Sequence, residues 1–168
     1  MTNARQEIEK IIENNYDVIF AFSVRALGCR QEAEDLTQDV CLSLAERLPA
    51  FRGECKLSSW LYRIVVNAAR DRIRHSQRLN LAKCEWGERK IFEDQDDRRR
   101  EDDLRFLREA MAHLDPTQRV TMALVVGGGF NQAEVAEILE VAPGTVAWRM
   151  SEIKKQLNAM ASVQGEVA

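Results

Sequence analysis

The sequence predicts an all-α fold of two small helical domains joined by a flexible linker. Apolar residues recur at helical spacing over most of the chain, whereas alternating β-branched runs bounded by turns are nearly absent. With 168 residues, 45% hydrophobic and 30% charged, the chain has enough apolar material for one ordinary domain or two small ones. We expect a first domain over residues 1–79, a linker over 80–102 and a second domain over 103–168.

Three helices are expected in the first domain. The first covers residues 4–27 and is ended by Gly28, with Asn14-Asn15 as a candidate interruption. The second runs from Gln31 to Leu48, where Pro49 stops it. After a loop over 49–57, the third starts at Ser58, a competent N-cap, and reaches Leu79.

Residues 80–102 lose helical periodicity. The dense mixed-charge run over 94–103 cannot bury a face, which is typical of an interdomain linker. A solvated surface helix with internal ion pairs is an equally open interpretation of residues 94–103.

The second domain carries stronger local signals. Asp115-Pro116-Thr117-Gln118 combines an N-cap, a proline at the first helical position and a capping box, and the helix it opens ends at Gly127-Gly128-Gly129. Asn131 and Glu134 form a second capping box, and Phe130 and Val135 occupy the positions of a hydrophobic staple. After Leu139 a three-residue turn leads to Pro143, which opens a final helix toward Met160. Two helices joined by so short a turn predict a helix-turn-helix unit.

The net charge of −3 and the pI near 5.5 argue against a nucleic-acid binder when taken alone. The charge is unevenly distributed, however. Residues 52–90 carry 10 basic and 4 acidic residues, whereas residues 1–51 carry 5 basic and 9 acidic ones. Residues 91–115 are again acidic, with 5 basic and 9 acidic residues, and residues 116–168 are nearly neutral, with 4 and 5. Such asymmetry is what an acidic and a basic binding surface on one chain would produce.

The expected third helix has a basic stripe. At about 100° per residue, its polar members fall within about 80° of arc, opposite an apolar stripe that includes Leu61 and Val65; they are Arg63, Asn67, Arg70, Arg74 and Arg78. Such a stripe could follow a nucleic-acid backbone, with the amide reading a base edge. Phe51, Trp60 and Tyr62, interleaved with cations, suit base stacking. An ordinary solvated face and core aromatics are the alternatives.

The expected second helix has the opposite character. One side carries Ala33, Leu36, Val40 and Leu44, a core stripe. The other carries Asp35, Gln38, Asp39 and Glu46 around an exposed Leu42. An apolar side chain ringed by carboxylates resembles a protein-docking patch, with ordinary solubility as the alternative.

Other site classes find little support in the sequence. The cysteines at 29, 41, 55 and 84 form no CxxC or CxxH pair, so we expect free thiols and no zinc site. Their spacing gives no indication of a redox role. No metal spacing, phosphate-binding glycine loop or nucleophile–base pair indicates an enzyme, and no cofactor is expected. No run of about 18 apolar residues and no secretory signal occur, so we expect a cytoplasmic protein without membrane insertion.

Three stretches carry a family resemblance. Ala33–Val40 (AEDLTQDV), Phe51–Glu54 (FRGE) and Trp60–Ala69 (WLYRIVVNAA) look like conserved region 2 of bacterial extracytoplasmic-function sigma factors. The helix-turn-helix over 131–157 matches region 4 of that family in spacing. The resemblance covers essentially the whole chain, and the AEDLTQDV and WLYRI–N pair is specific.

The resemblance implies a promoter-specific initiation subunit that binds core RNA polymerase and a bipartite promoter. Its core-binding residues, facing the clamp helices of the largest subunit, would be Asp35, Gln38, Asp39 and Leu42. Its −10 set would be Arg52, Lys56, Trp60, Arg63, Asn67, Arg70 and Arg74. Its −35 set, on a helix entering the major groove, would be Thr145, Trp148, Arg149 and Lys154. Members commonly contact the polymerase flap region and are held inactive by an anti-sigma factor, so both are expected partners.

The final helix departs from the family pattern. Gly144-Thr145-Val146 is followed by AWRMSE, where several basic residues are usual, leaving Arg149, Lys154 and Lys155 as the cations. Fewer phosphate contacts lower non-specific affinity, so the −35 contact is in question. Two alternatives stay open: a dimeric helix-turn-helix regulator that does not load polymerase, and a sigma-like decoy that only binds a regulator.

Overall fold

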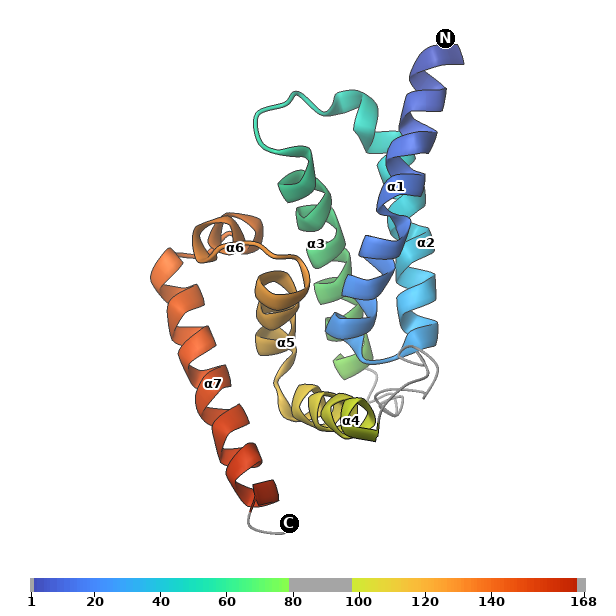
Figure 1. Cartoon of the computed structure of the whole chain (residues 1–168). Helices are drawn as coiled ribbons and strands as arrows, with labels where there is room; N and C mark the ends of the chain where they lie inside the picture. The colour runs from blue at the N-terminus through green and yellow to red at the C-terminus, as the bar shows by residue number, and fades with distance from the viewer. Residues whose placement is uncertain (1, 79–97, 166–168) are drawn as a thin grey trace. The chain divides into compact units, whose positions relative to one another are not determined.

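The computed structural model describes the backbone of residues 2–78 and 98–165 and the side chains within 6–78 and 105–162. The described residues form helices and turns, with no strand among them, which confirms the all-α prediction (Figure 1). The chain divides into two units, Met1–Ala82 and Lys83–Ala168. Most of the predicted linker over 80–102 lies outside the described residues. None of the described helices is both long and apolar enough to span a membrane.

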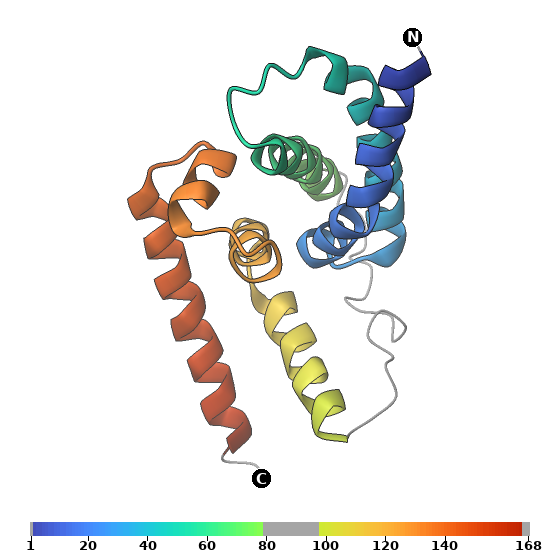
Figure 2. The ribbon, with the colours of Figure 1, turned by 45° about the horizontal axis from the view of Figure 1, so that its top comes forward.

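The first unit is built from α1 (Thr2–Leu27), α2 (Arg30–Arg47), the short 3₁₀ turn η1 (Leu48–Ala50) and α3 (Leu57–Arg78). α2 packs against both α1 and α3, and α1 also contacts α3 (Figures 1 and 2). Gly28 ends α1 as predicted, because its φ of 74° is the left-handed conformation that glycine adopts without steric cost. Its N–H donates to the carbonyl of Val24 at 2.8 Å.

The core of the first unit lies where these helices meet. Its fully buried side chains come from all of them and include Phe22, Leu36, Val40, Leu44, Val65 and Val66. The ring of Phe22 meets Tyr62 edge-on, with 5.5 Å between centroids. The buried hydroxyls of Ser23 and Thr37 donate to carbonyls four residues earlier, at 2.8 and 2.7 Å, so neither is left unsatisfied.

Local differences from the prediction have identifiable causes. α1 continues through Asn14-Asn15, because the Asn15 side-chain amide donates to the carbonyl of Ile11 at 2.7 Å within the helix. α3 begins at Leu57, and the N–H of Trp60 already donates to the carbonyl of Lys56 at 3.1 Å. Ser58 therefore lies inside the first turn of α3 and is not its N-cap. The loop after Pro49 is also shorter than predicted, since η1 includes this proline.

The second unit contains α4 (Arg98–His113), α5 (Pro116–Met122), the π-helical turn η3 (Ala123–Gly127), α6 (Gln132–Leu139) and α7 (Pro143–Gly165). α4 begins within the mixed-charge run, so its backbone follows the helical alternative from Arg98 onward; the side chains up to residue 104 lie outside the description. Both predicted capping boxes form. Asp115 accepts from the N–H groups of Thr117 and Gln118, and Asn131 accepts from those of Ala133 and Glu134.

A tight turn joins α6 to α7, as predicted for a helix-turn-helix unit. Glu140, with a left-handed φ of 56°, caps α6 and lets the N–H of Val141 donate to the carbonyl of Ala136 at 3.0 Å. Val135, Ile138, Val146 and Ile153 are buried at the contact of the two helices and their neighbours. Met111 of α4 and Leu114, directly after that helix, cluster with Ile153 of α7.

The glycine turn between η3 and α6 leaves no room for a side chain at Gly128. A Cβ there would lie 2.7 Å from the Phe130 ring and 2.9 Å from the backbone oxygen of Leu124. That oxygen accepts hydrogen bonds from the N–H groups of both Gly128 and Phe130, at 3.2 and 3.3 Å, so it is held in place.

We predict that Gly128→Ala lowers the free energy of unfolding of the second unit by about 1–3 kcal/mol, because overpacking against a fixed carbonyl forces the turn to shift. Thermal unfolding of the full chain, followed by circular dichroism, measures the effect. The matched control is Gly144→Ala. A Cβ at Gly144 meets nothing within 4 Å and lies in the first turn of α7, so this change should be neutral or slightly stabilising. Equal melting temperatures for the two variants would contradict the steric argument.

Candidate protein-docking and nucleic-acid interface

The outward side of α2 carries the predicted docking residues. Asp35, Gln38, Asp39 and Leu42 are all exposed, and Leu42 keeps 70% of its surface accessible. The opposite side buries Leu36, Val40 and Leu44, so the helix period forces the acidic side outward. We call the four exposed residues the acidic face. The exposed Leu42 of this face is available to an apolar contact, and the carboxylates are available to a basic partner.

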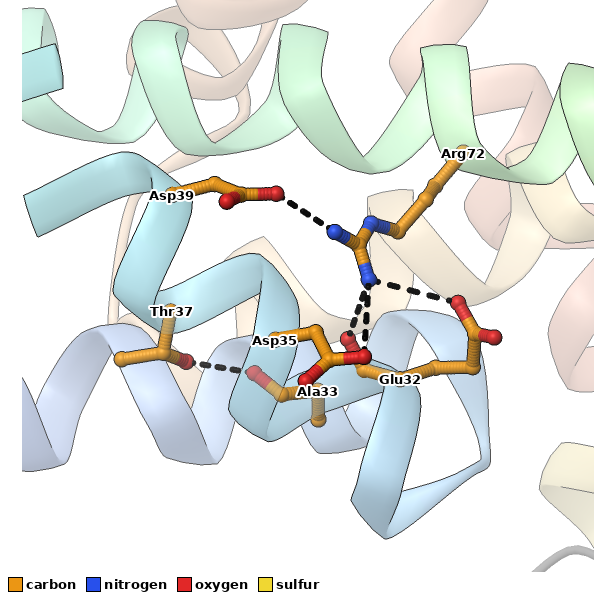
Figure 3. A network of polar contacts seen from close by, with 6 residues as sticks. All are labelled: Glu32, Ala33, Asp35, Thr37, Asp39 and Arg72. Atoms are coloured by element: carbon orange, nitrogen blue, oxygen red, sulfur yellow. Dashed lines mark hydrogen bonds and ion pairs between the residues drawn. The ribbon is translucent and has the colours of Figure 1, made fainter. Parts of the chain in front are cut away.

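An arginine from α3 reaches across to the acidic face. Figure 3 shows Arg72 between the side chain of Asp39 on one side and those of Glu32 and Asp35 on the other. Its Nη2 donates to Oδ2 of Asp39 at 2.5 Å. Its Nη1 donates to the backbone oxygen of Glu32 at 3.2 Å and to its Oε2 at 3.4 Å, and lies 3.8 Å from Oδ2 of Asp35. One guanidinium therefore links α3 to two turns of α2.

Sequence reasoning did not single out Arg72, although a signal was present. Leu61, Val65 and Ala69 are buried at successive helical spacings, and Arg72 follows three residues later on the same side of α3. It is therefore an arginine placed on the core-facing side of its helix. Its side chain is only 24% exposed, less than half the exposure of the Asp35 and Asp39 side chains.

The predicted basic stripe on α3 is only partly outward. Asn67, Arg74 and Arg78 are exposed, whereas Arg63 and Arg70 are half-buried. The cause is Val66, which lies beside this side of the helix and is fully buried, so the edge of the stripe packs into the unit. Arg74 also lies 3.5 Å from Asp71, an exposed pair that is screened by solvent. The part of the stripe that could reach a nucleic acid directly consists of Asn67, Arg74 and Arg78.

The loop before α3 adds two exposed cations, Arg52 and Lys56. Gly53, with φ of 72°, gives this loop its turn. Trp60 is half-buried and its ring packs against that of Phe51, with centroids 5.1 Å apart and planes tilted by 46°. The indole of Trp60 therefore packs against the loop, which is the alternative to base stacking given above for the aromatic residues. Part of the indole stays accessible to solvent.

On α7, Trp148 and Lys154 are exposed, and Thr145 and Arg149 are half-buried. Trp148 keeps 64% of its surface accessible, which is unusual for so large an apolar side chain. Lys155 is 2.6 Å from Glu152 in an exposed pair. The outward face of α7 therefore combines an indole with few cations.

Two arginines of the second unit contain buried donors. Nε of Arg119, on α5, and Nη1 of Arg149, on α7, have no hydrogen-bond acceptor among the described residues. Burial lowers the pKa of Arg119 from its ordinary value, and the nearby Asp115 carboxylate partly offsets this. Sequence reasoning found Arg149 but not Arg119, since one arginine inside an amphipathic helix gives no distinct signal.

The described cysteines have the environments of packing residues. Cys29 is buried, and Cys41 and Cys55 are half-buried, none of them in a disulfide; Cys84 lies outside the described residues. Burial raises the pKa of the Cys41 thiol, which lowers its thiolate fraction and its reactivity. In the part of the chain that the structure describes, no three His, Cys, Asp or Glu residues are grouped as a metal site.

Comparison with known proteins identifies the two units. Residues 11–79 match the family Sigma-70 region 2, and residues 105–157 match Sigma-70, region 4. The ECF RNA polymerase sigma factor SigM of Mycobacterium tuberculosis is 32% identical over 127 residues, which are 76% of this chain and 63% of that protein. The ECF RNA polymerase sigma factor EcfG of Rhodopseudomonas palustris is 26% identical over 145 residues, 86% of this chain and 80% of that protein. The chain thus matches less than two thirds of the length of SigM.

Solved structures share the fold. The sigma factor RpoE of Bartonella quintana, in complex with the anti-sigma factor NepR, superposes with a TM-score of 0.73 at 21% identity, covering 97% of this chain and 99% of that one. CnrH, in complex with the cytosolic domain of CnrY, gives a TM-score of 0.66 at 21% identity, covering 94% and 89%. The region 2 match contains the acidic face and the basic stripe, and the region 4 match contains the helix-turn-helix. The two matches together cover more than half of the sequence, so the chain belongs to the sigma-70 family, as a sigma factor of the extracytoplasmic-function (ECF) type.

Proposed function

We propose that the chain is a dissociable initiation subunit of bacterial RNA polymerase, which binds the core enzyme, recognises and melts promoters, and catalyses no reaction of its own. The observation that carries this proposal is the separation of charge within the first unit. α2 presents carboxylates around an exposed Leu42, and α3 presents cations around an exposed Asn67. Surfaces of opposite sign on one small unit suit two different partners, one basic and one polyanionic.

The acidic face is the proposed docking site for the clamp helices of the largest polymerase subunit. Carboxylates at the rim of an interface steer a basic partner, while an exposed apolar side chain supplies contact area that loses water on binding. Asp35 and Asp39 provide the carboxylates, and Leu42 provides the exposed apolar side chain. The same carboxylates would repel DNA, which keeps promoter contacts to the α3 side of the unit.

The α3 side is the proposed −10 contact, and α7 the proposed −35 contact. Asn67 and Arg74, with Arg52 and Lys56 of the preceding loop, are the exposed members of the predicted −10 set. An amide among cations can read an unstacked base while the cations hold the phosphates. On α7, Trp148 and Lys154 are exposed and would lie in the major groove if the helix-turn-helix docks as such units ordinarily do.

Control by an anti-sigma factor is the finer part of the proposal. The structures of RpoE and CnrH were solved as complexes, the first with an anti-sigma factor and the second with the cytosolic domain of CnrY. A regulator of this kind would cover the same exposed faces that the polymerase needs. We propose that the chain acts in the cytoplasm, where it meets the polymerase.

Run-off transcription with purified core polymerase and genomic promoter fragments tests the function. Initiation that depends on the added chain supports it. Absence of both core binding and initiation would overturn it, and DNA binding without core binding would favour a helix-turn-helix regulator. Core-independent binding of a regulator alone would favour the decoy alternative.

We predict that the double variant Asp35→Asn/Asp39→Asn weakens core binding by roughly tenfold or more, since the steering charges of the acidic face are lost. The dissociation constant for core polymerase, measured by fluorescence anisotropy, gives the result. The matched control is Glu13→Gln/Asp17→Asn, which removes two exposed carboxylates at the same helical spacing from α1. An equal loss in both double variants would indicate a general charge effect and contradict the assignment of α2.

We predict that Asn67→Ala changes the −10 preference and leaves core binding intact. The loss of a base-edge contact costs about 1–3 kcal/mol of discrimination, which corresponds to roughly five- to 150-fold in relative promoter use. Transcription from a library of −10 sequences measures it. Asn14→Ala, which removes an exposed amide from α1, is the control. An unchanged −10 preference in Asn67→Ala would remove this residue from the recognition set.

A further inference from the structure

We propose that Arg72 is a positioning residue for polymerase docking: its guanidinium holds the carboxylates of Asp35 and Asp39 in the orientation in which they meet a basic partner. The inference rests on the proposed function, because the face that Arg72 supports is the proposed docking site. Arg72 itself lies on α3 and is mostly covered, so it acts through the α2 carboxylates.

The geometry leaves the carboxylates available. Arg72 approaches Oδ2 of Asp39 at 2.5 Å and Oδ2 of Asp35 at 3.8 Å (Figure 3). The other oxygen of each carboxylate takes part in no recorded contact within the described residues, and the two side chains are 59% and 65% exposed. Oδ2 of Asp39 thus accepts a hydrogen bond from Arg72 and Oδ2 of Asp35 lies within ion-pair distance of it, while both carboxylates still face solvent. The backbone oxygen of Glu32, which also accepts from Arg72, fixes the guanidinium itself.

The charges explain why a counter-ion is needed. Glu32, Asp35 and Asp39 follow one another at three and four residues on the same side of α2, where like charges repel. Of the nearby cations, Arg30 pairs with Glu34 at 2.8 Å and Arg74 with Asp71 at 3.5 Å. Arg72 therefore supplies a positive charge next to Glu32, Asp35 and Asp39.

One arginine among three carboxylates reduces the repulsion without neutralising the face. The group keeps a net negative charge, so it still attracts a basic partner. Arg72 also restricts the conformations of the carboxylate side chains that it contacts. Fixing a side chain before binding removes the cost of immobilising it afterwards, and the planar fork of arginine can hold two acceptors on different turns. Lysine, with one nitrogen, cannot span Glu32 and Asp39 in the same way.

Binding of the full chain to core polymerase tests this inference, with Arg72→Gln, Arg72→Lys and the control Lys10→Gln, an exposed cation of α1. We expect Arg72→Gln to weaken core binding about five- to thirtyfold, as expected for two side chains that lose their fixed orientation. Arg72→Lys should also bind more weakly than the parent chain, and Lys10→Gln should bind like it. Circular dichroism at the assay temperature checks that each variant is folded.

A double-mutant cycle separates positioning from a merely structural role. If Arg72 acts through the carboxylates, Arg72→Gln should change core affinity less than twofold in a chain that already carries Asp35→Asn/Asp39→Asn. A full loss in that background would show that Arg72 supports the unit generally and overturn the inference. Unchanged or tighter binding by Arg72→Gln, or parent affinity in Arg72→Lys, would also overturn it. If the parent chain binds no core polymerase, the proposed function itself fails, which is a different result.

Discussion

The arrangement of the first unit depends on the burial of one side of α2. Leu36, Val40 and Leu44 retain 1% or less of their accessible surface, because α2 packs against both α1 and α3. Burying such side chains contributes about 1.5–3 kcal/mol each, far more than any surface contact of this helix. Once that side of α2 is buried, the helical period determines that the residues between the buried ones lie on the opposite side. The carboxylates and Leu42 must face solvent, so the acidic face is a consequence of core packing.

The same packing brings the acidic helix α2 and the basic helix α3 into contact. α2 is acidic and α3 is basic, and a close contact between them would otherwise neutralise both surfaces. Arg72 of α3 crosses to α2, where it contacts Glu32 and Asp39. Its contact is partly sheltered, so it is screened less by salt than the exposed pair of Arg74 with Asp71. The contact that joins α3 to α2 therefore also keeps the two helices' surface charges separate.

Local signals predicted most of the fold. Gly28, the two capping boxes and the turn after Leu139 each act through a few neighbouring residues, and each formed as expected. Features that depend on distant residues were not predicted. Arg72 bonds to a residue 33 positions away, and Arg63 and Arg70 are half-buried because a neighbouring valine is drawn into the core. The start of α4 was left open, since a mixed-charge run has no apolar period to mark a helix.

The uneven distribution of cations has a consequence for promoter binding on the proposed function. Residues 116–168 carry 4 basic and 5 acidic residues, and on α7 Lys155 is paired with Glu152. A helix-turn-helix with so few free cations releases few counter-ions and binds free DNA weakly. A polymerase that holds the unit beside the promoter raises its effective concentration, so modest contacts suffice. The weak basicity of α7 then favours promoter binding by the assembled holoenzyme over binding by the free chain, which keeps an unassembled subunit from occupying promoters.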